Sequence, residues 1–133
     1  MDIICDTSFL IALVSKPVTC FDKVEHEIGK LNFIVPTFVL DELESIKKNS
    51  GPKKSMIANT AIQISKLKFK ILDIGKSKNV DSKILNYTIN HRKYGVATLD
   101  GLLLNRLKGA EVTTITLSKN KMMIDNRYFE GYL

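Results

Sequence analysis

The segment from residue 3 to residue 13 places an acid directly between a buried strand and a helix. Ile3, Ile4 and Cys5 form a continuous apolar run, which is typical of a strand covered on both faces. Asp6 follows this run, and the apolar residues after it have the spacing of a helix. Because the carboxyl ends of the strands form the ligand crevice of an open α/β sheet, we expect Asp6 to lie in that crevice.

The rest of the chain repeats this alternation of short apolar runs and helical patterns. The pattern predicts strands at residues 3–5, 32–36, 69–74, 94–100 and 112–117. It predicts helices at residues 9–14, 21–29, 38–48, 53–67, 81–91 and 102–108, the first of them capped by Ser8. Strands that alternate with helices in this way predict a single α/β domain of three α/β/α layers with a mainly parallel central sheet.

Length and composition are those of one globular domain. The chain has 133 residues, of which 44% are hydrophobic and 26% are charged. We assign residues 1–118 to the domain and expect residues 119–133, with Tyr128, Phe129 and Tyr132, to pack as a tail on it or on a dimer partner. No apolar run reaches the about 18–20 residues that span a bilayer, and no cleavable leader pattern is present, so we expect a cytoplasmic protein without a membrane span. The two cysteines, Cys5 and Cys20, do not form a disulfide framework, and Cys5 is expected to act as a small hydrophobe.

The positive charge of the chain is concentrated in one segment. The net charge is +6, and the segment from Lys47 to Lys83 holds ten lysines against two acids, Asp73 and Asp81. The remaining residues carry ten bases and twelve acids. Such clustering suits a polyanion such as nucleic acid, although a solvated lysine-rich surface would have the same composition.

Four carboxylates are predicted to meet at one edge of the sheet. Asp6 and Asp100 each follow a buried strand, and Asp81 opens a helix, where aspartate also serves as a cap. Glu42 lies about a turn and a half into the helix after the second strand, on a stripe that we expect to face inward. Four acids in one crevice repel one another unless a cation offsets their charge, and carboxylate oxygens suit Mg²⁺ or Mn²⁺. Such an ion beside a lysine-rich surface predicts nuclease chemistry.

The order and spacing of these acids resemble the PIN domain, a family of metal-dependent ribonucleases related to flap-nuclease cores. The four motifs of that family are matched in order by Ile3-Ile4-Cys5-Asp6-Thr7-Ser8-Phe9-Leu10, Val35-Pro36-Thr37-Phe38-Val39-Leu40-Asp41-Glu42-Leu43, Val80-Asp81-Ser82-Lys83-Ile84-Leu85 and Ala97-Thr98-Leu99-Asp100. Each motif alone is degenerate, whereas the ordered set of four is fairly specific and spans roughly residues 2–118. The chain is similar both to toxin-type PIN proteins and to archaeal ribosome-processing PIN proteins.

The resemblance implies a role for each of these residues. The catalytic carboxylates that bind Mg²⁺ or Mn²⁺ would be Asp6, Glu42, Asp81 and Asp100. The groups that orient them would be Thr7, Ser8 and Thr98. A lysine-rich helical hairpin would contact the backbone of single-stranded nucleic acid through Lys47, Lys48, Lys53 and Lys54. Family members often carry a further acid or asparagine shortly after the last aspartate, whereas leucines occupy positions 102–104 here, so one metal ion and two remain alternatives.

The leading function is an endoribonuclease that cleaves single-stranded RNA with metal-activated water. It would serve as the toxin of a toxin–antitoxin pair, with an antitoxin protein as partner, or in RNA processing, with a ribosomal precursor as partner. A homodimer is expected by family analogy. The alternative is a catalytically degenerate PIN module that binds RNA or protein without cleavage. A phosphoacceptor receiver domain would need an acidic pair after the first strand, and a haloacid-dehalogenase-type phosphatase would need a second aspartate at Ser8, so both are disfavoured.

Overall fold

A computed structural model describes residues 1–76 and 78–127 of the chain, and in these ranges six strands form one sheet. The strands are β1 (Asp2–Cys5), β2 (Asn32–Pro36), β3 (Lys70–Leu72), β4 (Tyr94–Ala97), β5 (Thr114–Ser118) and β6 (Lys121–Asp125). The helices are α1 (Thr7–Ser15), α2 (Phe21–Ile28), α3 (Thr37–Asn49), α4 (Pro52–Lys68), α5 (Val80–Asn90) and α6 (Gly101–Gly109). All five predicted strands and all six predicted helices are therefore present in the structure.

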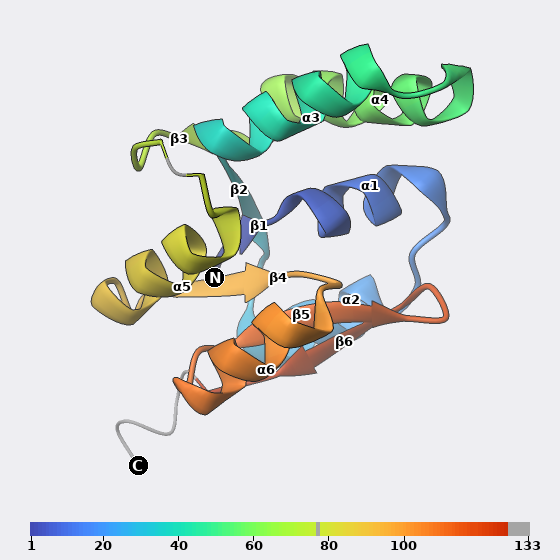
Figure 1. Cartoon of the computed structure of the whole chain (residues 1–133). Coiled ribbons are helices and arrows are strands. Elements are labelled where there is room, and N and C mark those ends of the chain that lie inside the picture. The colour runs from blue at the N-terminus through green and yellow to red at the C-terminus, as the bar shows by residue number, and fades with distance from the viewer. Residues whose placement is uncertain (77, 128–133) are drawn as a thin grey trace.

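The sheet has the strand order β3-β2-β1-β4-β5-β6 and is parallel except for β6, which is antiparallel to β5. Helices α1, α3 and α4 pack together on one side of the sheet, and α5 and α6 pack together on the other (Figure 1). These three layers confirm the predicted single α/β domain with a mainly parallel central sheet. The two helix layers result from right-handed crossovers between parallel strands. From β1 the chain adds β2 and then β3 on one side, and it then returns to add β4 on the other side of β1. This change of direction places the later helices on the opposite face of the sheet.

The reversal of strand order between β1 and β4 decides where the ligand crevice lies. In doubly wound sheets the loops after two such strands diverge to opposite faces and leave an opening at their carboxyl ends. Asp6 directly follows β1, and Thr98 and Asp100 follow β4. The topology thus brings the first and the last of the predicted carboxylates to the same opening.

The core is continuous across the sheet. β1 and β4 are buried along nearly their whole length, as their uninterrupted apolar sequences predicted. Cys5 is fully buried among them, and this burial raises the pKa of its thiol well above the usual value, so the side chain stays neutral. Gly95 allows β4 to pack closely, since a Cβ there would lie 2.8 Å from Cδ1 of Ile3 and 3.1 Å from the carbonyl oxygen of Thr113.

Two helix starts differ from the prediction. Asp6, not Ser8, is the N-cap of α1, because its carboxylate accepts the backbone N–H of Phe9 at 2.9 Å. The cap of α5 is Asn79, whose side chain accepts the N–H of Ser82 at 3.0 Å. Asp81 therefore lies within the first turn of α5 and is released from the capping role that aspartate often has at such positions.

The region after residue 118 continues the sheet. β6 turns back along β5 and pairs with it from Thr114 to Ser118, whereas no strand was predicted there. The aromatic residues expected in the tail, Tyr128, Phe129 and Tyr132, lie outside the described residues. Within the described ranges, no helix combines the length and the apolar character that crossing a bilayer requires.

Candidate active site

Asp6 is the most rigidly held of the four predicted carboxylates. Its side chain is only 4% exposed. One carboxylate oxygen, Oδ1, accepts the N–H of Phe9 at 2.9 Å and the hydroxyl of Ser8 at 2.8 Å, and the other, Oδ2, accepts the hydroxyl of Thr98. The donors come from α1 and from the segment after β4, so the carboxylate is held from both sides of the crevice.

Asp100 is tied to Asp6 through Thr98. The backbone N–H of Asp100 donates to the hydroxyl oxygen of Thr98 at 3.0 Å, and the same hydroxyl donates to Asp6. The Oδ1 atom of Asp100 caps α6 by accepting the N–H groups of Leu102 and Leu103 at 2.9 and 3.1 Å. A second hydrogen bond joins the segment after β4 to the start of α1, because the N–H of Leu99 donates to the hydroxyl oxygen of Ser8 at 3.0 Å.

Asp81 approaches the same site from α5. Its carboxyl group lies close enough to Asp100 for the charge of Asp100 to act on it. Partial burial raises the pKa of Asp81, and the charges of Asp100 and Glu42 raise it further, whereas Arg106 lowers it. Burial also raises the pKa of Asp6, with a smaller contribution from the charge of Asp81. The three aspartates therefore form one electrostatic unit.

Glu42 lies at the border of this unit and not in the interior. The prediction that it faces inward is wrong, because its side chain is exposed while Val39 and Leu43 of the same helix are fully buried. It lines a surface hollow of about 380 Å³ together with Asp41, Lys76 and Lys78. The charge of Glu42 nevertheless reaches Asp81 and raises its pKa, so it faces the same opening from the α3 side.

The donor set fits a hydrated divalent cation better than a closed metal cage. Asp6, Asp81 and Asp100 offer only oxygen atoms, which Mg²⁺ and Mn²⁺ prefer, and their mutual repulsion is a cost that a cation would offset. Within residues 1–76 and 78–127, however, no three His, Cys, Asp or Glu side chains are grouped closely enough to hold an ion between them. Since Mg²⁺ keeps several waters and is often bound by only one or two carboxylates together with substrate phosphate, such an open arrangement is compatible with it.

The polar residues next to Asp6 divide into two kinds. Ser8 and Thr98 hydrogen-bond to Asp6 and hold it, as expected for groups that orient a ligand. Thr7 makes no such contact, because its hydroxyl is buried without a hydrogen-bond partner in the described part of the chain, and its role stays a prediction. The reason is local: Asp6 is the cap itself, and the hydroxyl that returns to it belongs to Ser8, the second residue of the helix.

Three positively charged residues outside the predicted set lie beside the acids. Lys47, Lys48, Lys53 and Lys54 are exposed at the tip of the α3–α4 hairpin, which is fastened by the hydroxyl of Ser55 donating to the carbonyl of Lys47 at 2.6 Å. Sequence reasoning missed Lys76 and Lys78, which line the hollow beside Glu42, and Arg106, which acts on Asp81. Their position in the sequence was a usable signal, since the two lysines directly precede the motif that contains Asp81.

The shifted carboxyl groups predict how stability depends on pH in the absence of metal. Because the pKa values of Asp6 and Asp81 are raised from 3.8, the folded protein binds more protons than the unfolded chain between 3.8 and the folded-state values. Stability is therefore expected to fall as the pH rises through this window, and Mn²⁺ is expected to restore it above the window by binding the ionised groups. Thermal unfolding with a chelator and with Mn²⁺ measures both effects.

Two variants test whether the carboxyl groups of the site cause this fall in stability with rising pH. Asp81→Asn should flatten the fall in Tm, since it removes one of the two groups, whereas Asp22→Asn on the exposed surface of α2 should leave it unchanged. An identical pH profile for wild type and Asp81→Asn would contradict the assignment.

Comparisons with known proteins agree with this architecture. A family model described as a PIN-like domain matches residues 3–120. The solved structure of the PIN domain endonuclease Utp24 is similar with a TM-score of 0.73 and 22% sequence identity, over 93% of this chain and 90% of that one. A domain of a functionally unknown protein from Methanocaldococcus jannaschii is similar with a TM-score of 0.57 and 18% identity, over 88% of this chain and 91% of that one.

No curated protein matches the sequence. At the identities found, the two structural similarities establish the fold alone. The family model, in contrast, covers all four carboxylates and most of the chain, from residue 3 to residue 120. The chain belongs to the PIN-like domain family.

Proposed function

We propose that the protein is a metal-dependent endoribonuclease that cleaves single-stranded RNA. The observation that supports this most strongly is the joining of Asp6, Asp81 and Asp100 into one electrostatic unit at the opening between β1 and β4. Three acids from three separate segments meet there, the pKa values of Asp6 and Asp81 are raised, and groups with shifted pKa values cluster at functional sites. The structural similarity to the PIN domain endonuclease Utp24 is compatible with the same chemistry.

Each residue of the site has a distinct role in the proposed reaction. Asp6 supplies a carboxylate whose orientation is fixed by three donors before any ligand binds. Thr98 couples the position of Asp6 to that of Asp100, so that the two oxygen donors are held together. Asp81 and Glu42 approach from α5 and α3 and add negative charge on the remaining sides. A bound Mg²⁺ or Mn²⁺ would supply charge stabilisation for the phosphodiester and would activate water for its hydrolysis.

The substrate side of the proposal rests on the lysines around the acids. Lys76 and Lys78 line the hollow next to Glu42, and the α3–α4 hairpin presents four more lysines. These side chains match the repeating negative charge of an RNA backbone and would position a strand without reading its bases.

Charge removal at the hairpin tests this substrate side. Replacing Lys47, Lys48, Lys53 and Lys54 by alanine is expected to weaken binding of single-stranded RNA by about tenfold and to reduce the slope of log K against log salt by up to about 2.8, or 0.7 for each phosphate contact. Fluorescence anisotropy over a range of salt concentrations measures both quantities. A control that removes one charge elsewhere is Lys23→Ala on α2, which should change the slope by less than about 0.7. An unchanged slope would show that the hairpin lysines do not contact RNA.

Cleavage of a labelled single-stranded RNA tests the function itself. Wild-type protein should produce internal cuts with Mn²⁺ or Mg²⁺ and none with a chelator, and a double-stranded RNA of the same sequence should be cut more slowly. Absence of cutting with either ion would reject the nuclease. The biological setting is proposed as a toxin, which would be neutralised by an antitoxin protein, or as an RNA-processing factor acting on a ribosomal precursor. A homodimer is proposed by family analogy.

Three observations favour a second candidate, a PIN module that binds RNA or protein without cutting. In the described residues the carboxylates do not form a compact ligand group, and Glu42 is exposed. In addition, Leu103 is buried in the α6 turn where family members often carry a further polar ligand. RNA binding that survives without any metal-dependent cleavage would support this candidate.

A further inference from the structure

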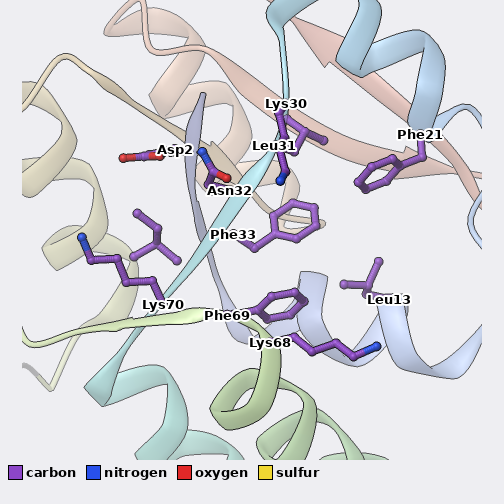
Figure 2. Close-up of a pocket in the computed structure, with 11 residues that line it drawn as sticks. Asp2, Leu13, Phe21, Lys30, Leu31, Asn32, Phe33, Lys68, Phe69 and Lys70 are labelled. Carbon is purple, nitrogen blue, oxygen red and sulfur yellow. Dashed lines mark hydrogen bonds between the residues drawn. The ribbon is translucent and has the colours of Figure 1, made fainter.

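A second hollow, of about 660 Å³, opens at the opposite, amino-terminal edge of β1 and β2. Its floor is aromatic: the ring centre of Phe33 lies 6.2 Å from that of Phe21 and 5.3 Å from that of Phe69, and both pairs meet edge to face. Phe33 is buried, whereas Phe21, Phe69 and Leu13 of α1 are partly exposed (Figure 2). We call this site the aromatic hollow; its outer rings are held in place by Phe33 and keep part of their surface open.

Two lysines give the aromatic hollow a positive charge. Figure 2 shows the side chains of Lys30 and Lys68 on the same side as the rings, whereas Lys70 extends to the other side. Neither Lys30 nor Lys68 forms an ion pair within residues 1–76 and 78–127. Within these ranges, therefore, no ion pair neutralises their charge.

The acid at the rim does not offset these lysines. Asp2 accepts a hydrogen bond from the side-chain amide of Asn32 at 3.2 Å, and Figure 2 shows its carboxylate turned away from the rings. The side of the hollow that faces the rings thus combines aromatic surface with unpaired positive charge. An occupant that complements it has a flat aromatic group and a negatively charged group close together.

We propose that the aromatic hollow is a subsite for one nucleotide of a single-stranded RNA, with the base against Phe21 and Phe69 and the flanking phosphates on Lys30 and Lys68. Aromatic side chains beside a basic track are the usual means of binding single strands without sequence preference. The volume of about 660 Å³ lies within the range of small-ligand sites and exceeds what one apolar side chain would fill. This inference rests on the proposed function, because it takes the occupant to be part of the same RNA that reaches the acids.

The position of the aromatic hollow sets a length requirement. It lies at the amino ends of the strands, while Asp6 lies beyond the carboxyl end of β1, which is four residues long. At a rise of about 3.3 Å per residue the two sites are at least about 13 Å apart. Only an RNA several nucleotides long can occupy both, so a strand that reaches both sites should bind more tightly than one that reaches only one of them.

Removal of the two charges tests the subsite. The double variant Lys30→Ala/Lys68→Ala is expected to bind an RNA of about 20 nucleotides about tenfold more weakly in chelator, with a salt slope reduced by about 1.4. The control Lys23→Ala/Lys121→Ala removes the same charge from exposed lysines of α2 and β6 and should leave this affinity unchanged. Equal losses for both double variants would overturn the subsite because they indicate a general field effect.

Photocrosslinking locates the occupant directly. An RNA that carries a single 4-thiouridine at successive positions should crosslink to Phe21 or Phe69 at one register, and Phe69→Leu should remove the crosslink at Phe69 and weaken binding without changing the salt slope. Crosslinks confined to the acidic edge would overturn the subsite while leaving the nuclease proposal intact. Crosslinks at the aromatic hollow without metal-dependent cleavage would support the subsite and reject the nuclease.

Discussion

Replacement of Asp6 by asparagine is expected to lower the rate of RNA cleavage by about 10²–10³-fold while the fold persists. Asparagine keeps the volume of the side chain, and its amide oxygen can still accept the N–H of Phe9 and cap α1. What it removes is the buried negative charge that attracts the divalent cation. Initial rates of cleavage at saturating Mn²⁺ measure the loss, and circular dichroism establishes that the helices remain.

The same substitution carries a second expectation that a purely structural role would not produce. Burial raises the pKa of Asp6, which means that the ionised side chain is disfavoured in the folded protein at neutral pH. The neutral variant in chelator should therefore unfold at the same Tm as wild type or at a higher one, and Mn²⁺ should stabilise it less. Asp22→Asn, on the exposed surface of α2, should change none of these quantities. Cleavage by Asp6→Asn at the wild-type rate would reject the proposed site.

Replacement of Thr98 by valine is expected to affect both stability and activity, because one hydroxyl serves both aspartates. Valine has nearly the same shape but can neither donate to Asp6 nor accept the N–H of Asp100. Since Thr98 is fully buried, the lost partners should cost about 1–3 kcal/mol of unfolding free energy. Loss of a group that orients a metal ligand typically lowers metal affinity or activity by about 10–100-fold, and we expect the same here.

The conservative variant separates the hydroxyl from the packing of Thr98. Thr98→Ser keeps the hydroxyl and loses the methyl group, so it should lose stability but retain most of the activity. Chemical denaturation gives the stability, and titration calorimetry with Mn²⁺ gives the affinity. If Thr98→Val cleaved RNA as well as Thr98→Ser, the hydroxyl bridge would have no role in the site.

Five strands and six helices could be predicted because the sequence patterns that specify them lie within a few neighbouring residues. A continuous apolar run such as Ile3-Ile4-Cys5 can only be satisfied by burial on both faces, and prolines and glycines mark where helices cannot continue. β6 escaped prediction because its turn lacks the glycine that usually marks a two-residue hairpin. Lys119 and Asn120 form it with φ values of 51° and 65°, a left-handed turn that is usually recognised by Asn-Gly or Asp-Gly.

The role of Glu42 shows where periodicity loses resolution. Its stripe on α3 includes Val39, which is fully buried, and Ile46, which is only half-buried. Glu42 lies at the border of that stripe, and a rotation of one residue, about 100°, separates it from the buried Leu43. Whether a border position faces the core or a surface opening depends on the neighbouring element, in this case the loop that carries Lys76 and Lys78.

Two kinds of information are therefore distinguishable in this protein. The amino-acid order alone is sufficient for the elements other than β6, for the α/β class and for the placement of acids after buried strands, because hydrophobic periodicity and backbone preferences act within a few residues. Tertiary structure alone decides which groups meet. The strand order β3-β2-β1-β4-β5-β6 makes β1 and β4 neighbours. Asp6 therefore accepts a hydrogen bond from the hydroxyl of Thr98, although the two residues are 92 positions apart in the sequence. Contacts of that range arise only from packing of the whole sheet, and from them follow the buried cap at Asp6, the bridge to Asp100 and the raised pKa of Asp81.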